Sequence, residues 1–496
     1  MINLDIATGK ERESIIGFTK DQSEAYLALI DFIKKDYDER DYKRALIGAA
    51  GTGKTYLVKA LIKNCGLSYS TIGLSAPTHK ACRVLQESIK IPNIKVNTLQ
   101  SDLGLRLNFD AENFDLNNPP FDPKGKIKID SYSLYIVDES SMIPNNNSRD
   151  SHNKGKGLLY FLENICKQNK CKIIYIGDES QLPPVKENYS SAFKNITIHS
   201  LKQIVRQDDD NPVRHLLSML RYDISHKTFT FLNYISKNRE QFDTNNIKGY
   251  KVCNTNEFNQ IVYNNFNDKQ LEKNVDFCKI ICYTNYAVSS WNKLVRNLII
   301  KDAEKSIITT NDLILSYTTI VNAFNDCIIK NSEDYILKDV VNYTHPIYNL
   351  KGFMVRFVAI HGGNITTPLF VLDHKDKFSI QLYVKKMNDL LNEAKNASYS
   401  TRAQRWRDYF TFRENCLLIA DIVSTDGRVL FSRNIDYGFA ISSHKSQGST
   451  YDTALVDVND IVYDKLGNPY TDAEQINRRL YVACSRCKNK LYLKFG

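Results

Sequence analysis

The segment Gly48–Thr55 constrains the fold of this chain more than any other feature. It reads Gly-Ala-Ala-Gly-Thr-Gly-Lys-Thr and fits the phosphate-binding pattern G-x-x-x-x-G-K-[ST]. The apolar run Ala45–Ile47 predicts the end of a buried strand before the loop, and Tyr56–Ile62 predicts a helix after it. Glycines let the backbone turn tightly, so that successive N–H groups and the helix N-terminus point at an anion. The loop therefore predicts an α/β domain that binds a nucleoside triphosphate.

The end of this loop carries the side chains that a bound nucleotide needs. We expect Lys54 to reach the β- and γ-phosphates and the Thr55 hydroxyl to ligate Mg²⁺. A glycine-rich turn that only caps a helix is the alternative, but the Lys-Thr pair between a strand and a helix disfavours it. The expected nucleotide contacts in the loop are Gly48, Gly51, Thr52, Gly53, Lys54 and Thr55.

A second apolar run, Leu134–Val137, ends in the carboxylates Asp138 and Glu139. In a parallel sheet this strand end would lie beside the phosphate-binding loop. We expect Asp138 to hold Mg²⁺, usually through water, and Glu139 to orient and deprotonate the attacking water. An Asp-Glu pair is often only a solvated strand end, but its place after a phosphate-binding loop favours the catalytic interpretation.

Two glutamines are further candidates for the nucleotide site. Gln181 follows the apolar run Ile173–Ile176, and we expect it to bond the γ-phosphate or the attacking water. Gln22 follows Thr19, a candidate N-cap, and its amide can both donate and accept, as the N6 and N7 edge of adenine requires. The alternative for Gln181 is a plain turn stiffened by prolines, and the alternative for Gln22 is a surface position without a ligand.

Two arginines, Arg206 and Arg486, are candidates to stabilise charge in the transition state. Arg206 follows the first α/β half of the chain, and Arg486 lies near the C-terminus. An arginine that reaches the γ-phosphate from a second domain couples hydrolysis to domain closure.

Other motifs are typical of contact with a polyanion. Ser75–Ala81 and Ile441–Ser449 each place hydroxyl and cationic side chains where a strand gives way to a helix, and such points bind phosphate without reading sequence. Two such sets suggest one nucleic-acid strand lying across both. Tyr283-Thr284-Asn285 and Trp291 add hydrogen-bonding and stacking candidates, although the core is the alternative place for Trp291.

Length and composition set wider bounds. The 496 residues allow about three or four domains at roughly 100–200 residues each, and the formal charge of +10 permits a polyanionic partner without requiring one. The N-terminus shows no signal peptide and no apolar stretch approaches the ~20 residues of a membrane span, so we expect a cytoplasmic protein without a membrane partner. The 11 cysteines are expected to be structural thiols, although Cys484 and Cys487 have zinc-like spacing.

Apolar runs alternate with helical patterns in two regions, which predicts two parallel α/β sheets. The expected strands of the first region are Ala45–Ile47, Ser70–Ser75, Leu134–Val137 and Lys172–Ile176. Those of the second region, which begins after about residue 195, are Thr197–Leu201, Lys279–Tyr283, Tyr437–Ser442 and Ala454–Val458.

Two insertions interrupt this pattern. Residues 104–130 predict a hairpin, with Leu105, Leu107 and Phe109 alternating on one arm and Ile127 and Ile129 on the return arm. Residues 307–432 predict a β-rich module with a helical arm. Its expected strands are Phe353–Ile360, Leu369–Leu372 and Phe378–Val384, and a helix is expected over Lys385–Asn396.

The order of these motifs resembles that of the superfamily 1B helicases, the 5′→3′ branch that includes Pif1-like and RecD-like enzymes, and it is most similar to the phage Dda-like members. The matching segments, in chain order, are Gln22, Gly48–Thr55, Ala76–Lys80, Thr98–Ser101, Asp138-Glu139, Gly177–Pro184, Arg206-Gln207, His444–Gly448 and Tyr481–Arg486. The last motif departs from the usual Leu-Thr-Arg or Val-Thr-Arg ending, because this chain has Cys484-Ser485-Arg486, but the arginine is retained.

The resemblance implies two RecA-like domains, at residues 1–103 with 131–200 and at residues 201–306 with 433–496, with ATP and Mg²⁺ in the cleft between them. It implies a strand-separating pin at residues 104–130, whose tip is Phe109, Phe114 or Phe121, with Phe114 and Phe121 nearer the expected tip. An SH3-like domain at residues 307–432 would brace the pin. Gly448 joins the expected nucleotide contacts. The expected DNA contacts are Pro77, Thr78, His79, Lys80, Thr98, Ser101, Asn285, Ser443, His444 and Ser446.

We therefore predict an ATP-dependent 5′→3′ DNA helicase that moves along single-stranded DNA and opens forked duplexes. The resemblance implies a monomer that acts in phage replication, recombination or repair, with replisome and single-strand-binding proteins as further candidate partners. A translocase without strand separation shares every motif except a working pin. A nucleotide-switched binding protein of the GTPase type is disfavoured, because the chain has no Asn-Lys-x-Asp guanine-reading motif.

Overall fold

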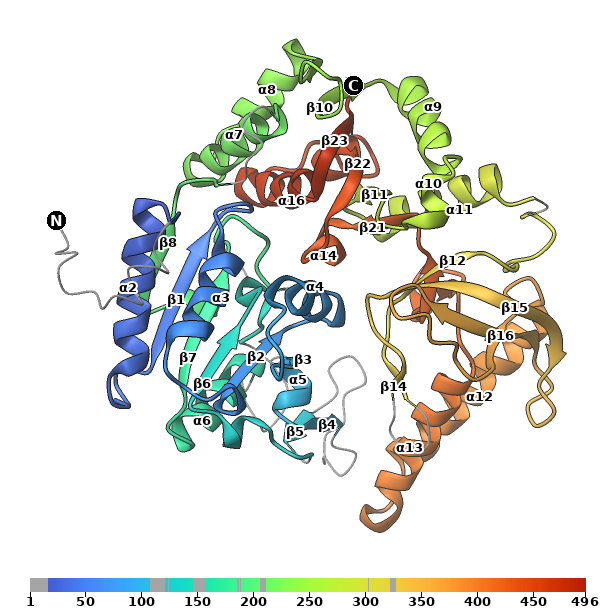
Figure 1. Ribbon diagram of the computed structural model, residues 1–496. Coiled ribbons are helices and arrows are strands. Elements are labelled where there is room, and N and C mark those ends of the chain that lie inside the picture. Colours follow the sequence, from blue (N-terminus) through green and yellow to red (C-terminus); the bar gives the residue numbers. More distant parts are fainter. Residues whose placement is uncertain are drawn as a thin grey trace.

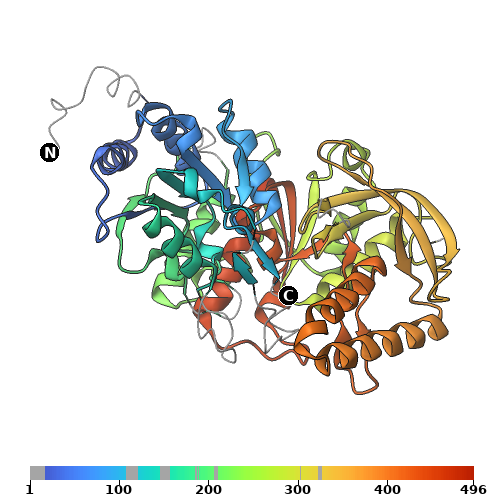
Figure 2. The ribbon, with the colours of Figure 1, turned by 90° about the horizontal axis from the view of Figure 1, so that it is seen from below.

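The computed structural model describes residues 17–107, 121–123, 125–145, 157–184, 187, 189–205, 211–301, 303–321 and 327–496. Its described residues form three units, each built on one larger sheet. Figure 1 shows the first unit at lower left, the second at the top and the third at right, and the view from below in Figure 2 agrees with this arrangement. The units meet around helices α4 and α14.

The first unit is a six-stranded, fully parallel sheet in the order β3-β2-β6-β7-β1-β8. Its strands are β1 (Lys43–Gly48), β2 (Ile72–Ala76), β3 (Val96–Thr98), β6 (Leu134–Val137), β7 (Lys172–Gly177) and β8 (Thr197–Leu201). Its helices are α2 (Lys20–Lys34), α3 (Lys54–Asn64), α4 (His79–Ile89), α5 (Leu99–Asp102) and α6 (Leu158–Gln168).

The four central strands β1, β2, β6 and β7 are largely buried on both faces, which explains why they are mostly apolar runs. Leu46 and Ile174 pack with the residues of α2, α3 and α4, whereas Ala45 and Ile173 pack on the other face with those of α6. Parallel strands with covered faces place their carboxyl ends along one edge, and the phosphate-binding loop and Asp138 lie there.

The second unit is a six-stranded sheet in the order β21-β11-β22-β23-β10-β9, parallel except for the edge strand β9. Its strands are β9 (Glu240–Phe242), β10 (Gly249–Cys253), β11 (Cys278–Cys282), β21 (Ala440–Ser442), β22 (Tyr451–Asp457) and β23 (Cys487–Lys494). Its helices are α7 (Val213–His226), α8 (Thr230–Lys237), α9 (Thr255–Phe266), α10 (Gln270–Lys273), α11 (Asn285–Ile299), α14 (Ser443–Ser446), α15 (Val458–Val462) and α16 (Ala473–Ser485).

The third unit is an antiparallel sheet in the order β17-β16-β15-β12-β20 with a pair of long helices. Its strands are β12 (Leu313–Ser316), β15 (Asp334–Thr344), β16 (Lys351–Ala359), β17 (Leu369–Leu372) and β20 (Ile435–Tyr437). Two short hairpins join it, β13 (Ile320–Val321) with β14 (Cys327–Ile329) and β18 (Ile422–Val423) with β19 (Val429–Phe431). The helices α12 (Lys377–Lys395) and α13 (Tyr399–Asn415) project from it at the lower right of Figure 1.

The expected α/β class is confirmed, and four local expectations need correction. Thr197–Leu201, expected in the second region, is β8 and pairs with β1 of the first sheet. Residues 435–437, which the expected Tyr437–Ser442 strand overlaps, form β20 and pair with β12 of the third sheet. Phe378–Val384, expected as a strand, is the first half of α12, because Ser379, Tyr383 and Met387 are buried at helical spacing.

The fourth correction concerns the hairpin at residues 104–130. Its return strand is β5 (Phe121–Pro123), which pairs antiparallel with β4 (Leu105–Leu107). Ile129 lies instead in a short 3₁₀ turn and is buried in the core beneath α6. Residues 108–120, which include Phe109 and Phe114, lie outside the described residues, so the identity of the pin tip stays a prediction.

Candidate nucleotide-binding site

The phosphate-binding loop joins β1 to α3, as expected from its sequence. Gly51 and Gly53 adopt φ values of 87° and 83°, which side chains rarely tolerate. A Cβ at Gly48 would lie 2.5 Å from the Thr52 hydroxyl oxygen, so the loop folds tightly onto itself. Lys54 Nζ donates to the carbonyls of Gly48 at 2.5 Å and Ala49 at 3.0 Å, and thus points into the concave side of the loop. The backbone and the lysine are arranged to receive an anion.

Gln22 lies at this loop, but not as the free base reader that its sequence suggested. Its Nε2 donates to the carbonyl of Thr52 at 2.8 Å, and its Oε1 accepts from the backbone N–H of Thr19 at 3.0 Å. The side chain is buried, and a Cβ at Gly53 would come within 2.4 Å of its Nε2. Both ends of the amide are therefore occupied by backbone groups, and Gln22 braces the loop against α2.

The carboxylates Asp138 and Glu139 follow β6 at the same edge of the sheet. Burial raises the pKa of Asp138, and burial followed by repulsion from Asp138 raises the pKa of Glu139 to about 7. The positive charges of Arg486 and Lys54 oppose that rise in the pKa of Glu139. Glu139 also adopts a left-handed φ of 50°, a strained backbone of the kind that functional sites retain. A carboxylate with a pKa near neutrality is suited to accept a proton from water.

The expected Mg²⁺ and nucleotide fit the residues present. The Thr55 hydroxyl on α3 and the Asp138 carboxylate after β6 are hard oxygen donors, which Mg²⁺ prefers. The tight loop itself requires its glycines, because Gly51 and Gly53 have left-handed φ values and a Cβ at Gly48 or Gly53 would meet Thr52 or Gln22. A bound Mg²⁺ would supply neutralising charge for the phosphates of the substrate.

Gln181 belongs to a segment that touches the second unit directly. The buried Gln447 donates through Nε2 to the carbonyl of Leu182 at 3.2 Å and lies 3.4 Å from Oε1 of Gln181. Tyr481 of α16 donates its hydroxyl to Asp178 at 2.7 Å in a buried contact. Arg478, also of α16, donates to the carbonyls of Glu179 and Gln181. The segment after β7 therefore links the carboxylate site to α16.

These cross-unit partners were not assigned roles from the sequence. Gln447 and Tyr481 lie inside recognised motifs, but nothing in their spacing shows that they contact residues 266 and 303 positions earlier, respectively. Arg478 lies just outside a motif. Only a signal that pairs positions between the two sheets could have identified them.

The structure describes one of the two candidate arginines, Arg486, and not the other, Arg206. Arg486 is buried at the end of α16, where its guanidinium donates to the carbonyls of Val482 at 3.0 Å and Ser449 at 3.2 Å. Its charge nevertheless acts on Glu139, as described above. Arg206 lies outside the described residues, and its role stays a prediction.

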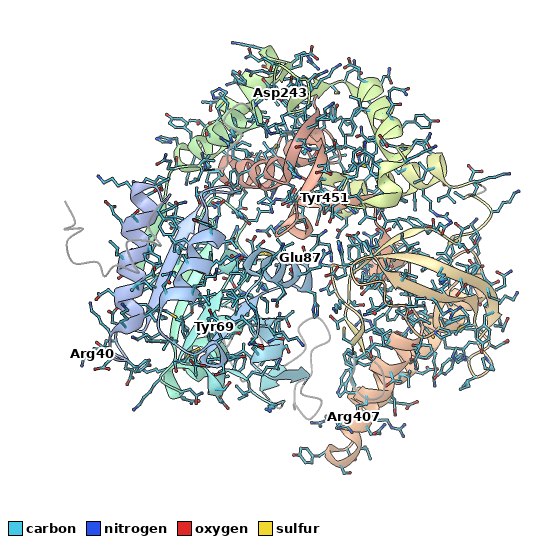
Figure 3. All side chains as sticks on the ribbon, viewed as in Figure 1. Arg40, Tyr69, Glu87, Asp243, Arg407 and Tyr451 are labelled. Atoms are coloured by element: carbon cyan, nitrogen blue, oxygen red, sulfur yellow. The ribbon has the colours of Figure 1, made fainter. Side chains whose placement is uncertain are left out.

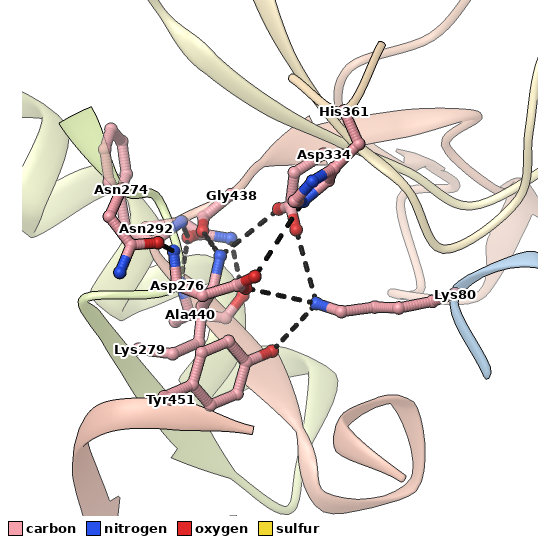
Figure 4. A network of polar contacts seen from close by, with 11 residues as sticks. Lys80, Asn274, Asp276, Lys279, Asn292, Asp334, His361, Gly438, Ala440 and Tyr451 are labelled. Carbon is pink, nitrogen blue, oxygen red and sulfur yellow. Dashed lines mark hydrogen bonds and ion pairs between the residues drawn. The ribbon is translucent and has the colours of Figure 1, made fainter. Parts of the chain in front are cut away.

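Lys80 was expected to contact DNA, and the structure contradicts this, because its ammonium is buried among carboxylates of the other units (Figure 4). Lys80 Nζ lies 3.4 Å from Asp334 of β15 and 3.6 Å from Asp276 of the second unit. The hydroxyl of Tyr451 is 3.3 Å away, and Tyr451 lies at the centre of the molecule in Figure 3. These carboxylates satisfy the lysine, so that Lys80 ties the three units together.

Two expected DNA contacts in the His444 region also need correction. The Ser443 hydroxyl donates to the carbonyl of Cys282 at 3.0 Å, and the Ser446 hydroxyl donates to that of Ser443 at 2.8 Å. Both serines are buried, so that neither is presented to a nucleic acid. Gly448, expected at the nucleotide, has a φ of 73°, and a Cβ placed on it would lie 3.2 Å from the Cβ of Ala81 on α4; its contact with the nucleotide stays a prediction.

Other expected DNA contacts do lie on accessible surfaces. Thr78 caps α4, and together with His444 it lines a cavity of about 190 Å³ where the three units meet. His79, Thr98 and Ser101 line a larger groove beside it. Asn285 is exposed at the start of α11, and Pro77 is half-buried. Trp291 is a core residue, since its Nε1 donates to Asp457 at 2.8 Å and its ring is buried.

The cysteines pack as small apolar side chains. Ten of the 11 are buried, and burial raises the pKa of Cys487 to about 12. The part of the chain described above contains no helix long and apolar enough to cross a membrane.

Comparison with known proteins gives one family match, for residues 31–236, to an AAA domain family. An uncharacterized protein of Acanthamoeba polyphaga mimivirus is 24% identical over 518 residues, covering 93% of this chain and 97% of that protein. An uncharacterized protein of Methanocaldococcus jannaschii is 24% identical over 472 residues, covering 90% of this chain and 36% of that protein.

Similar solved structures include the Pif1 helicase from Candida albicans, with a TM-score of 0.47 and 17% identity over 97% of this chain and 94% of that one. They also include Pif1 helicase from Bacteroides in complex with ADP-AlF3 and ssDNA, with a TM-score of 0.46 and 15% identity over 95% and 91%. The AAA domain match begins in α2, spans the whole first sheet and ends in α8, so it contains the phosphate-binding loop and both carboxylates.

Proposed function

We propose that this protein is an ATP-driven motor on single-stranded DNA, a Pif1-like helicase that moves 5′→3′ and separates duplex strands. The observation that carries the proposal is the direct contact between the nucleotide site of the first unit and α16 of the second. Tyr481 and Arg478 donate hydrogen bonds to the segment that bears Gln181, and the charge of Arg486 opposes the rise in the pKa of Glu139. A change at the γ-phosphate would therefore reach the second unit through a few direct contacts.

In the proposed mechanism, Lys54 leaves the loop carbonyls of Gly48 and Ala49 and donates to the phosphates of ATP. Glu139 accepts a proton from the attacking water as the water oxygen bonds to the γ-phosphorus and the bond to the leaving ADP oxygen breaks. Gln181 orients the water or the γ-phosphate, and Arg486 neutralises developing negative charge. The products are ADP and inorganic phosphate.

Movement along the strand requires that the units change position in each cycle. Thr78 of the first unit and His444 of the second line the same cavity, so that one backbone passing through it would touch both units. Closure on ATP and reopening after hydrolysis would shift these two contacts against each other. The domain boundaries, the pin, the 5′→3′ direction and the likeness to Dda-like members belong to this proposal.

Fork unwinding tests the proposal. Duplexes with a single 5′ tail or a single 3′ tail are incubated with protein, ATP and Mg²⁺, and strand release is followed on a native gel. We expect release from the 5′-tailed substrate only, and none with Lys54→Ala. ATP hydrolysis that is stimulated by single strands without release would instead indicate a translocase, and release from the 3′-tailed substrate alone would reject the direction.

A further inference from the structure

The second and third units share one hydrophobic core, which the first unit does not join. That core contains Val288 and Trp291 of α11 together with Tyr335 of β15 and Phe357 of β16. Among the residues that the structure describes, the buried clusters of the first unit contain residues of that unit alone. Close-packed side chains resist displacement, so we expect the second and third units to move as one joined body. A movement of the first unit then takes place at its polar boundary with this joined body.

Lys80 lies at that boundary, between two carboxylates of the joined body (Figure 4). Its Nζ is 3.4 Å from Oδ2 of Asp334 on β15 and 3.6 Å from Oδ1 of Asp276, which precedes β11. Charge-assisted hydrogen bonds of this kind are normally about 2.7–2.9 Å long, so the ammonium is near both oxygens and bonded closely to neither. Oδ1 of Asp276 is buried and accepts no hydrogen bond from the described part of the chain. This oxygen can therefore receive the ammonium fully.

Each carboxylate also has a partner other than Lys80. Lys279 Nζ lies 3.2 Å from Asp334, and His361 Nε2 lies 3.8 Å from Asp276. The hydroxyl of Tyr451 is 3.3 Å from Lys80 Nζ, and the centre of its ring is 5.1 Å away. The Lys80 side chain is buried, and a buried ammonium that loses every counter-ion is strongly destabilised. Two adjacent carboxylates let the ammonium change position without becoming unpaired.

We propose that Lys80 is a sliding contact of the motor cycle, whose ammonium passes between Asp334 and Asp276 as the first unit moves over the joined second and third units. This inference rests on the proposed function and deepens it, because it names the boundary at which the units move. Lys80 stays paired throughout the movement, and the third unit follows the second. Lys80 is thus a positioning residue outside the nucleotide site.

The substitution Asp276→Asn removes one of the two positions and keeps the shape of the side chain. We expect ATP hydrolysis stimulated by oligothymidylate to slow about tenfold, because an ammonium that leaves Asp334 then has no second counter-ion. Binding of the oligothymidylate should stay at the wild-type value. Asp452→Asn is the matched control, since Asp452 is 30% exposed against 27% for Asp276 and its cation is also 3.6 Å away. That cation, Lys488, belongs to the same unit, so the control should keep the wild-type rate.

Distances between paired nitroxide labels report the movement itself. The labels are attached at Ser88→Cys on α4, Asn297→Cys on α11 and Lys338→Cys on β15, which are exposed positions in the three units. The background is Cys327→Ser, because Cys327 is exposed and the other ten cysteines are buried. Electron paramagnetic resonance compares the protein alone with the protein bound to ADP–aluminium fluoride and oligothymidylate. We expect the distance between positions 88 and 338 to shift and that between positions 297 and 338 to stay constant.

Asp276→Asn connects the two measurements. In this variant the shift between positions 88 and 338 should be lost, because Lys80 keeps Asp334 as its one carboxylate. A shift between positions 297 and 338 in the wild type would overturn the joined body. A wild-type shift or a wild-type rate in Asp276→Asn would overturn the role of Lys80, and the proposed function stands in each of these cases. If neither distance shifts in protein that binds the strand, the movement that the proposed function requires is absent and both fail.

Discussion

Asp334 provides the sharpest test of how the three units are held together. One buried carboxylate serves two buried ammonium groups, since Lys279 Nζ lies 3.2 Å and Lys80 Nζ 3.4 Å from its oxygens. The three side chains are 3%, 1% and 7% exposed, respectively. The two lysines hold the pKa of Asp334 below its usual value although burial opposes this. The substitution Asp334→Asn keeps the shape and removes the charge.

The expected loss follows from the remaining partners. Removing one partner of a buried ion pair costs about 3–5 kcal/mol, because a charge stays buried without its counter-ion. Lys80 keeps Asp276 at 3.6 Å and Lys279 keeps the carbonyl of Gly438 at 2.6 Å, so we expect the lower end, about 3 kcal/mol. That loss corresponds to an opening equilibrium about 150-fold larger at 25 °C.

Amide hydrogen exchange in β12 and β15 measures this opening locally, which avoids assuming that the whole chain unfolds in one step. Asp339→Asn is the matched control on the same strand. Its partner is Arg356, the two side chains are 40% and 46% exposed, and the change should cost at most about 1 kcal/mol. Equal exchange rates in the two variants would refute the assignment of Asp334 as the shared counter-ion.

Three further predictions concern single contacts. Gln22→Ala should lower kcat/KM for ATP and GTP by the same factor, because Gln22 braces the backbone of the loop; a loss confined to ATP would restore the base-reading role. Tyr481→Phe removes the hydroxyl that bonds Asp178, and it should reduce the stimulation of ATP hydrolysis by single strands more than the basal rate, which steady-state assays with and without oligonucleotide compare. Burial lowers the pKa of His374 to about 4, and its Nε2 accepts from the N–H of Ala420. The imidazole titrates near 6.5 in the unfolded chain, so its contribution to the free energy of unfolding is present above that pH and is lost as the pH falls toward 4. Between pH 7 and 5, thermal melts should show that the free energy of unfolding of the wild type falls by roughly 1–2 kcal/mol more than that of His374→Gln.

The sequence predicts where the phosphate-binding loop and Asp138 lie in the fold, because the signals for both are local. Loop, strand and helix around Gly48–Thr55 follow one another along the chain, and Asp138 directly follows its own strand. The alternation of apolar runs and helices was also sufficient for the α/β class.

Contacts between distant segments could not be predicted. Lys80 reads as a DNA contact because it follows a strand, and only the tertiary structure shows Asp276 and Asp334 around it. Likewise Ser443 and Ser446 have the right chemistry for phosphate, but their hydroxyls bond nearby carbonyls and are buried. A polar residue at a strand end is as suited to internal bonding as to ligand binding, and the sequence does not distinguish the two.

The error in α12 has a different cause. Phe378, Ile380 and Leu382 alternate with polar residues as in a strand, but the buried positions follow the helical spacing that continues through Met387 and Leu390. The seven residues Phe378–Val384 alone favoured the two-residue period of a strand. The hydrophobic pattern over the full length of α12 follows the period of a helix and would have corrected the prediction.

The central claim, that ATP hydrolysis moves the protein along a single strand, is tested most directly by displacement of streptavidin from biotinylated oligonucleotides. The oligonucleotides carry biotin at the 3′ or the 5′ end, and free streptavidin is measured over time with ATP and Mg²⁺. The account predicts rapid, ATP-dependent release from the 3′ end, slow release from the 5′ end and no release by Lys54→Ala. The absence of ATP-dependent release from both ends, in protein that binds the strand, would contradict it.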